Sequence, residues 1–282
     1  MNKTWLCGRF ELSFERPLLM GIVNITPDSF SDGNHYLQAD AAIAHAKQLI
    51  ADGADILDIG AESTRPGAEP VALDEELRRL LPVIEGLRAL NVPISVDTFK
   101  PAVMRAVLAA GVDIINDIDG FRDPESIAAV AGTNCGLCVM HMQGEPRTMQ
   151  QQPSYQDLHL EVKNFLSDRV QVLRSAGVAP QRIMLDPGLG FGKTVEHNYT
   201  LLRDLEKIQI DSYPWLIGLS RKSMIGHVVN KAPQQRLAGS LAGMLAAVSR
   251  GAAVLRVHDV AESADALNVW LAVEQGIKNE HS

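Results

Sequence analysis

The sequence predicts an α/β fold, a (β/α)8 TIM barrel, on the basis of three observations. Eight short apolar runs recur along the chain, and each is flanked by segments of helical pattern. The runs show little alternation of polar and apolar residues, which is typical of strands buried on both faces of a parallel sheet. The length of 282 residues suits one barrel, because such domains run to about 250 residues. We therefore expect a single domain over residues 1–282.

Each predicted strand is a short apolar run, and most end in a polar residue. In chain order the strands are expected at Leu18–Asn24, Ile56–Gly60, Ile94–Asp97, Ile114–Asn116, Leu137–His141, Ile183–Asp186, Trp215–Leu219 and Val254–His258. Strands that alternate with helices in this way favour closure into a barrel. An open doubly wound sheet is the alternative, but no GxGxxG motif follows the first strand to support it.

Helical pattern fills the segments between and after the strands. The helices are expected at Ala39–Ala51, Asp74–Leu90, Pro101–Ala110, Pro124–Ala131, Tyr155–Ala176, Glu196–Ile208, Gln234–Arg250 and Ala264–Ile277. Pro101 and Pro124 fit the first turn of their helices. Gly111 and Gly177 each follow a Xaa-Ala pair and are typical of residues that end a helix. Thr4–Phe14 resembles a short β-ribbon, an N-terminal extension over residues 1–16 that could plug the bottom of the barrel.

Composition excludes several classes of function. The net charge is −8 and no basic run stands out, which argues against a nucleic-acid partner. The charges of Arg9, Glu11, Glu15 and Arg16 leave no apolar core of signal-peptide length. The longest apolar stretch, Leu237–Val248, is far shorter than the roughly 20 residues of a membrane helix. We therefore expect a cytoplasmic protein without a membrane partner.

The three cysteines, Cys7, Cys135 and Cys138, do not indicate a disulfide framework in a chain of this size. Cys135 and Cys138 form a CxxC pattern, but it leads into the apolar run of a strand, whereas a redox CxxC lies at a helix N-terminus. A second cysteine pair that could complete a zinc site is also missing from the sequence. We interpret all three as core residues.

Polar residues stand at nearly every predicted strand end. They are Asn24, Glu62, Asp97, Asn116 with Asp117, His141, Asp186, Ser220 to Lys222, and Arg256 with His258. One Asp after a strand is often only a helix cap or a turn residue. Eight such ends together indicate an active site, because the carboxyl ends of barrel strands meet at one rim.

The rim chemistry suits a flat heterocycle that has an anionic substituent. Asp97, Asp186 and Asn116 offer acceptors and one amide to ring N–H groups, and Lys222 adds a cation. Arg65, Arg221, Arg256 and His258 suit a phosphate or diphosphate. Arg256 and His258 are two residues apart on a strand, so both project to the same side. Three loops, 24–33, 62–67 and 186–193, are rich in turn formers, hydroxyls and glycine.

With these residues in view, the chain resembles the dihydropteroate synthases, the pterin-binding barrel enzymes of folate synthesis. The resemblance spans essentially the whole chain and rests on eight motifs in the family's order. They are GIVNITPDSFSD from Gly21, ESTRPG from Glu62, SVDT from Ser95, IND from Ile115, MHMQG from Met140, DPGLGFGK from Asp186, SRKS from Ser220 and RVH from Arg256.

The resemblance implies a role for each matching residue. Asp97, Asn116, Asp186 and Lys222 would hold the pterin ring, with Met140, Phe191 and Gly218 lining its slot. Asn24, Thr64, Arg65, Arg256 and His258 would bind the diphosphate, with Mg²⁺ on Asn24. Phe30, Thr64, Arg65, Pro66, Ser220, Arg221 and Lys222 would shape the 4-aminobenzoate site. The catalytic groups would be Asp32, Asp97, Lys222, Arg256 and His258, and sulfonamides would compete with aminobenzoate.

The implied reaction replaces the diphosphate on the pterin methylene by the arylamine nitrogen. We hypothesise that diphosphate leaves first, because an aniline nitrogen is already neutral and departure of the anion is the harder step. Two rivals are a methyltransferase that binds methyltetrahydrofolate in a related barrel and a catalytically silent pterin-binding paralogue. Small residues between Ala238 and Ala247 suit either packing on the barrel or a subunit interface, and the resemblance favours a homodimer.

Overall fold

The computed structural model describes residues 4–25, 35–63, 69–145 and 148–277, without the side chains of residues 35–37. Eight parallel strands close into a barrel in the order β10-β3-β4-β5-β6-β7-β8-β9. They are β3 Leu18–Asn24, β4 Ile56–Gly60, β5 Ile94–Asp97, β6 Ile114–Asp117, β7 Gly136–Met140, β8 Ile183–Asp186, β9 Trp215–Ile217 and β10 Ala252–Val257. The predicted fold class, a (β/α)8 barrel, is confirmed.

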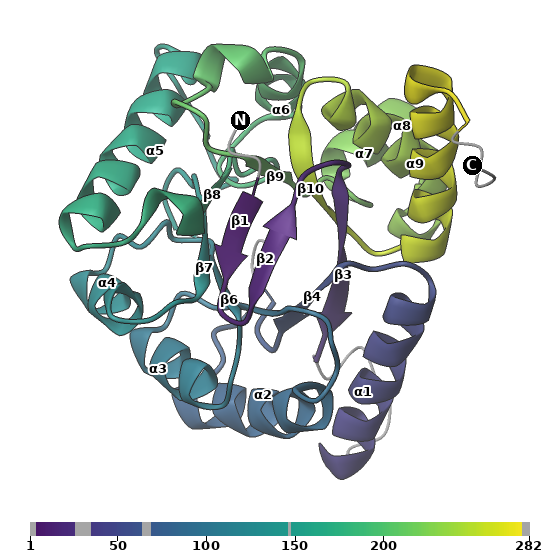
Figure 1. The fold of residues 1–282 in the computed structure, drawn as a ribbon. Coiled ribbons are helices and arrows are strands. Elements are labelled where there is room, and N and C mark those ends of the chain that lie inside the picture. Colours follow the sequence, from purple (N-terminus) through teal and green to yellow (C-terminus); the bar gives the residue numbers. More distant parts are fainter. Residues whose placement is uncertain (1–3, 26–34, 64–68, 146–147, 278–282) are drawn as a thin grey trace.

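Helices surround the barrel on all sides (Figure 1). They are α1 His35–Ala51, α2 Leu73–Leu87, α3 Pro101–Ala109, α4 Pro124–Ala131, α5 Leu158–Ser175, α6 Val195–Arg203, α7 Ser223–Val229, α8 Leu237–Val248 and α9 Val260–Gln275. Short 3-10 turns lie at Pro180–Arg182, Leu205–Ile208 and Pro233–Gln235. In the part of the chain that the structure describes, none of the helices is long and apolar enough to span a bilayer.

The sequence analysis did not predict helix α7, and it predicted several other elements to be longer than they are. Helix α7 has only seven residues, too few to show a helical period. The predicted helix Glu196–Ile208 is divided, because α6 ends at Arg203 and a 3-10 turn follows. Strand β9 ends at Ile217, two residues earlier than expected, and Gly111 and Gly177 both end their helices with positive φ, as predicted.

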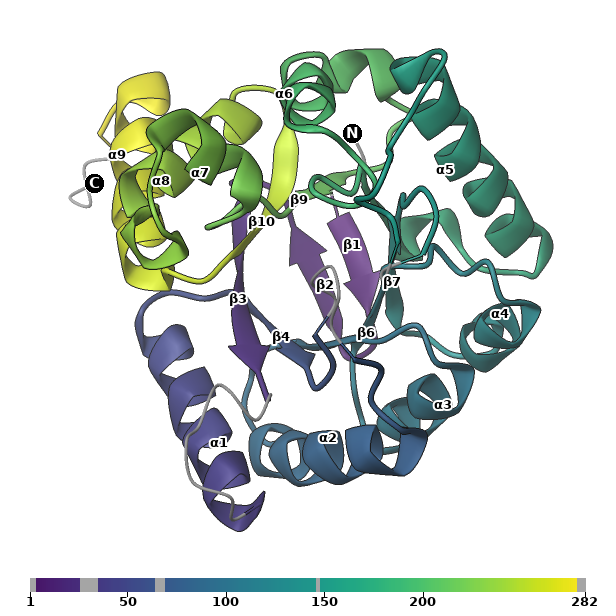
Figure 2. The same cartoon turned by 180° about the vertical axis from the view of Figure 1, so that it is seen from behind.

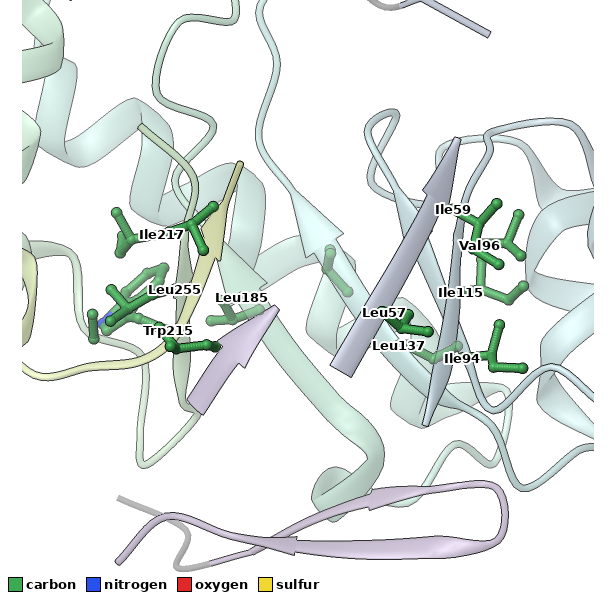
Figure 3. Close-up of a cluster of buried hydrophobic side chains, with 14 of the residues drawn as sticks. Leu57, Ile59, Ile94, Val96, Ile115, Leu137, Leu185, Trp215, Ile217 and Leu255 are labelled. Atoms are coloured by element: carbon green, nitrogen blue, oxygen red, sulfur yellow. The ribbon is translucent and has the colours of Figure 1, made fainter. Parts of the chain in front are cut away.

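Side chains alternate between the two faces of each barrel strand. Leu57, Ile59 and Val96 belong to the large core between strands and helices, and Figure 3 shows such residues on opposite sides of the barrel. Ile56 and Ile114 belong instead to a second core inside the barrel. Because successive side chains of a strand point to opposite faces, Asp58, Ser95 and Asn116 must also point inward, above this second core.

The N-terminal ribbon closes one end of the barrel. Strands β1 Thr4–Cys7 and β2 Phe10–Ser13 pair antiparallel and lie across the barrel end in Figure 1. Trp5 and Cys7 are fully buried in the inner core, and the Trp5 indole nitrogen donates to the carbonyl of Arg182 over 2.9 Å. The ribbon therefore plugs the bottom of the barrel, and the opposite end, seen in Figure 2, contains the strand carboxyl ends.

Candidate active site

A buried network of polar side chains lies at the carboxyl end of the barrel, centred on Asp58 of β4. The Asp58 carboxylate accepts hydrogen bonds from the Ser95 hydroxyl at 2.6 Å, from the Asn116 amide at 3.2 Å and from Arg256 Nε at 2.6 Å. Its side chain is fully buried. A buried charge needs such a complete set of partners, so the network fixes the positions of Asn116 and Arg256.

Asp97 joins this network from β5. Its carboxylate accepts a hydrogen bond from Arg256 Nη2 over 3.1 Å, so one guanidinium bridges Asp58 and Asp97. Asp97 is also the register partner of Asn116 in the neighbouring strand. Burial raises the pKa of Asp97 to about 7, although the charge of Arg256 opposes that rise. The site therefore contains a carboxyl group that can be either protonated or ionised near neutral pH.

Asp186 and Lys222 form the opposite side of the same cluster. Burial raises the pKa of Asp186, and the charge of Lys222 partly offsets this. Burial lowers the pKa of Lys222 to about 8, against the attraction of Asp186. Lys222 Nζ donates to the carbonyl of Leu189 over 2.6 Å and lies 4.8 Å from the centre of the Phe191 ring. These two contacts direct its ammonium group toward the glycine-rich loop.

The glycine-rich loop from Asp186 to Lys193 is held by a buried ammonium group. Lys193 Nζ donates to the carbonyls of Gly188 and Phe191, each over 3.0 Å, and contacts His141 Nδ1 over 2.8 Å. Burial lowers the pKa of Lys193 to about 7 and that of His141 to about 2. The neutral imidazole can therefore accept from Lys193, and the loop places Phe191 beside Lys222.

A second group of predicted residues lies where β9 and β10 end. His258 Nδ1 is 3.1 Å from the Ser220 hydroxyl, and the backbone nitrogen of His258 donates to that hydroxyl over 3.3 Å. Arg221 donates from Nε and Nη2 to the two carboxylate oxygens of Asp259. The φ angle of Arg221 is 59°, a left-handed conformation that is uncommon outside glycine and recurs at functional sites.

The remaining predicted lining residues also converge on the cluster. Met140 is the register partner of Asp186. A Cβ atom built on Gly218 would lie 3.6 Å from Arg256 Cβ and 3.9 Å from Lys222 Nζ, so this glycine borders both cations. Of the predicted site residues, Phe30, Asp32, Thr64, Arg65 and Pro66 lie outside the described residues.

Asn24, the residue predicted for magnesium, ends β3 and pairs in register with Gly60. Among the described residues, no group of three or more His, Cys, Asp or Glu side chains could hold a metal ion. One amide oxygen fits Mg²⁺ only as part of a ligand set, and Mg²⁺ commonly takes its other oxygens from water and substrate phosphates. Asn24 is therefore compatible with a metal that arrives together with a diphosphate.

Sequence reasoning missed Asp58, Ser95 and Lys193. Asp58 was hidden inside the apolar run Ile56–Gly60, and Ser95 lies within the next strand. A signal was present, because a charged residue between two outward-facing apolar residues of a barrel strand must point inward. Lys193 gave no comparable signal, since only the folded loop shows that its ammonium group is buried.

The fold and the buried polar cluster at the carboxyl ends of the strands are together typical of a barrel enzyme. Comparisons with known proteins narrow this class. Residues 20–258 match the family model described as pterin binding enzyme. The dihydropteroate synthase of Neisseria meningitidis serogroup C is 50% identical over 274 residues, which cover 95% of this chain and 97% of that protein.

Solved structures agree. The dihydropteroate synthase of Burkholderia cenocepacia complexed with 7,8-dihydropteroate is 56% identical with a TM-score of 0.89, and the match covers 96% of each chain. That of Xanthomonas albilineans with 4-aminobenzoic acid is 48% identical with a TM-score of 0.91, covering 98% of this chain and 99% of that one. The chain belongs to the dihydropteroate synthase family of pterin-binding enzymes.

Proposed function

We propose that the carboxyl end of this barrel joins (7,8-dihydropterin-6-yl)methyl diphosphate to 4-aminobenzoate, with 7,8-dihydropteroate and diphosphate as products. As a member of the dihydropteroate synthases, the chain is a transferase that forms a carbon–nitrogen bond in folate biosynthesis. The observation that supports the proposal best is the buried network in which Asp58 accepts from Asn116 and Arg256, and Arg256 also donates to Asp97. We take residues 1–282 as one pterin-binding domain.

In this proposal the pterin ring lies against Asp97, Asn116, Asp186 and Lys222. Two carboxylates can accept from adjacent ring N–H groups, and the amide and the ammonium can donate to ring nitrogen and oxygen. Met140, Phe191 and Gly218 would line the slot. The methyltransferase rival would share these ring contacts, but the diphosphate site described next distinguishes the two functions.

The diphosphate would bind to Arg256 and His258, with Asn24, Thr64 and Arg65. Arg256 lies in β10 and His258 directly follows the end of that strand, where its Nδ1 is 3.1 Å from the Ser220 hydroxyl. Asn24 would hold Mg²⁺ together with oxygen atoms of the diphosphate, and the ion, when bound, would neutralise charge on the leaving group. Arg256 bridges Asp58 and Asp97 in the structure, so it would stabilise the leaving anion while it stays paired with the ring-binding carboxylate of Asp97.

The aminobenzoate would bind beside this site, against Phe30, Thr64, Arg65, Pro66, Ser220, Arg221 and Lys222. Lys222 would contact both substrates from its position over the Phe191 ring, 4.8 Å away. The guanidinium of Arg221 pairs with Asp259. Arg221 would therefore contribute by fixing the backbone that positions its neighbours Ser220 and Lys222. Sulfonamides, which resemble aminobenzoate, would compete for the same place.

The chain's own groups favour departure of diphosphate before attack by the amine. Positive charge that develops on the pterin methylene would be stabilised by Asp97 and Asp186, with Asp32 near the reacting centre. Arg256 and His258 would stabilise the departing anion. Asp32, Asp97, Lys222, Arg256 and His258 would therefore be the catalytic residues. Segments 24–33 and 62–67 would exclude water, which would otherwise capture the cation.

The function is tested by incubating the purified protein with dihydropterin diphosphate, Mg²⁺ and labelled 4-aminobenzoate. Labelled dihydropteroate is the expected product, and its absence with both substrates bound would indicate a silent pterin-binding protein. Asp186→Ala should lose pterin binding in calorimetry, and Phe30→Ala should chiefly weaken aminobenzoate binding. Normal pterin binding by Asp186→Ala would show that the pocket assignment is wrong.

The order of bond breaking is tested by positional isotope exchange. The ester oxygen that joins the pterin methylene to the α-phosphorus is labelled, and the enzyme is incubated with this substrate in the absence of aminobenzoate. If diphosphate departs first and rotates while bound, the label scrambles into non-bridging positions. Consistent absence of scrambling, with binding and rotation demonstrated, would count against departure first.

We also propose a cytoplasmic homodimer. Val269, Val273 and Ile277 are exposed by 67%, 77% and 83%, and a partner subunit would cover them. The small residues of α8 support packing instead, because a Cβ atom built on Gly239 would lie 2.5 Å from Ile225 Cγ2 of the same chain. Light scattering tests the dimer, and a monomer at micromolar concentration would contradict it.

A further inference from the structure

Lys100, just beyond β5, binds three groups that precede it in the chain by 24 to 38 residues. Its Nζ donates to Glu62 Oε2 over 2.6 Å, to Glu76 Oε2 over 2.6 Å and to the carbonyl of Val71 over 2.5 Å. These groups belong to the segment after β4, to helix α2 and to the residues that precede α2. All three ammonium protons therefore have an acceptor.

Glu62 closes the same junction from the other side. Its Oε1 accepts a hydrogen bond from the backbone nitrogen of Val71 over 3.1 Å, while its Oε2 binds Lys100. The two ends of the 62–71 segment are thus bound directly to each other and also through one cation. We call Glu62, Val71, Glu76 and Lys100 the segment clamp.

The clamp is built into the interior and is not a surface ion pair. The side chains of Glu62, Glu76 and Lys100 are only 10%, 1% and 21% exposed. The second oxygen of Glu76 accepts from the Thr98 hydroxyl over 2.8 Å, and that hydroxyl also accepts from the backbone nitrogen of Lys100 over 3.3 Å. Exposed pairs contribute little, but a buried pair with all its hydrogen bonds made specifies one geometry.

The clamp connects the two halves of the proposed site. Thr98 directly follows Asp97, which is proposed to hold the pterin, and Lys100 lies two residues further on. The 62–71 segment contains Thr64, Arg65 and Pro66, which are proposed to contact aminobenzoate. A segment whose ends are fixed samples fewer conformations than one whose ends are free.

From this arrangement we infer that Lys100 and Glu62 are positioning residues for the aminobenzoate substrate, a conclusion that rests on the proposed function. They bind neither substrate themselves. They fix both ends of the 62–71 segment relative to Asp97, and so determine the affinity for the arylamine while leaving the pterin site unchanged. Displacement of a positioning group by about 1 Å can cost up to 100-fold, so the expected effect is measurable.

The first variant to test is Glu62→Ala. It removes the direct bond to Val71 and leaves Lys100 paired with Glu76, so no buried charge loses its last partner. We expect the KM for 4-aminobenzoate, at saturating pterin substrate, to rise about tenfold. The Kd for dihydropterin diphosphate, measured by calorimetry, should stay within about twofold. The matched control is Glu125→Ala, which removes the same charge from an exposed pair with Arg105 and should change neither constant.

A second variant, Lys100→Met with Glu62→Gln, dissolves the clamp without changing the net charge near Asp97. It should raise the KM for 4-aminobenzoate further, whereas Lys100→Arg, which keeps the cation, should restore most of the affinity. An unchanged KM in both variants, or equal losses for both substrates, would overturn the inference and leave a merely structural role.

Hydrogen exchange separates this inference from the proposed function. In Glu62→Ala the amide of Val71 should exchange faster than in the wild type and in Glu125→Ala, whatever the enzyme catalyses. Unchanged exchange would overturn the clamp. A wild-type protein that forms no dihydropteroate would instead overturn the proposed function, and the exchange data would still decide whether the clamp fixes the segment.

Discussion

At the ribbon end of the barrel the buried interior is apolar, and Trp5, Cys7 and Met184 are fully buried there among aliphatic neighbours. Toward the carboxyl end, the next inward-facing residues of the same strands are polar or charged, among them Asp58, Ser95 and Asn116. Asp58 is fully buried, and Asp97 lies beside it. The same strands contribute to both ends, so the difference lies in the inward-facing residues and not in the fold.

The two ends of the barrel differ in how much they contribute to the stability of the fold. Apolar groups at the ribbon end stabilise the fold by leaving water, at roughly 25 cal/mol per Å². Charged groups at the carboxyl end lose hydration, and their mutual attraction often does no more than offset that loss. Such a cluster is retained when its chemistry is needed, which fits an active site at one end only.

The largest effect that we expect is on stability, from Trp5→Ala at the ribbon end. This change leaves a cavity in a close-packed core and removes the indole hydrogen bond to Arg182. Loss of a large buried aromatic costs about 3–5 kcal/mol in the free energy of unfolding. Urea denaturation measures the loss. At low temperature, where the variant is still folded, its Kd for the pterin substrate should equal that of the wild type, and a weakened Kd would show that the two ends are coupled.

Asp58→Asn should show the opposite pattern at the carboxyl end. The amide keeps the shape of the carboxylate but removes the charge that fixes Arg256, whose remaining partner is Asp97. We expect kcat/KM to fall about 100-fold, as with the loss of one preorganised electrostatic contact. Unfolding should change far less than in Trp5→Ala. Asn is the better replacement than Ala, because it can still accept from Ser95. Wild-type kcat/KM in this variant would contradict the role of Asp58.

How much of this site could be predicted from sequence follows from the same alternation of side chains. Asp97 and Asp186 are the last residues of their apolar runs, so the sequence alone predicts that they lie at the carboxyl rim. The structure brings these two residues together. Asp58 lies within a run, where hydrophobic content hides a single charge. Which residues of a strand face inward and which face outward can be assigned only when the barrel is known.

Interactions between distant segments could not be predicted at all. The Lys193 contact with His141 joins residues 52 positions apart, and the Arg256 contact with Asp58 joins residues 198 positions apart. Neither pair follows from a local pattern. The helix ends at Gly111 and Gly177 were predictable for the opposite reason, because positive φ is a property of the residue and its neighbours.

A smaller effect concerns pH. Burial raises the pKa of Asp97 to about 7, so the ionised form, which in the proposed function would accept from the pterin, decreases below that pH. Affinity for a dihydropterin that lacks the diphosphate should fall up to about tenfold for each pH unit below 7. Calorimetry in buffers of different ionisation enthalpy should detect release of a proton on binding. Asp97→Asn should bind more weakly and without this dependence, and a persistent slope would assign the titration to another group.

The same shift has a consequence for stability with a definite sign. In the folded, unliganded protein Asp97 keeps its proton up to about pH 7, whereas in the unfolded chain its pKa is near the ordinary 3.8. The folded state therefore binds more protons between these values. This contribution to stability is fully present below pH 3.8 and is lost as the pH rises through 7. The difference in unfolding free energy between wild type and Asp97→Asn should follow this course.

The smallest effect is expected from the cysteines, which test whether the ribbon end has any chemistry of its own. Cys7, Cys135 and Cys138 are buried, and burial raises the pKa of each thiol. Because the thiolate is the reactive form, a thiol reagent should label none of them in the native protein and all three in urea, and activity should be unchanged. Rapid labelling of the native protein with loss of activity would indicate that the ribbon opens. It would contradict the statement that the ribbon end is chemically inert. Slow labelling at the rate of global unfolding would support it, since all three thiols would then become exposed only when the apolar core does.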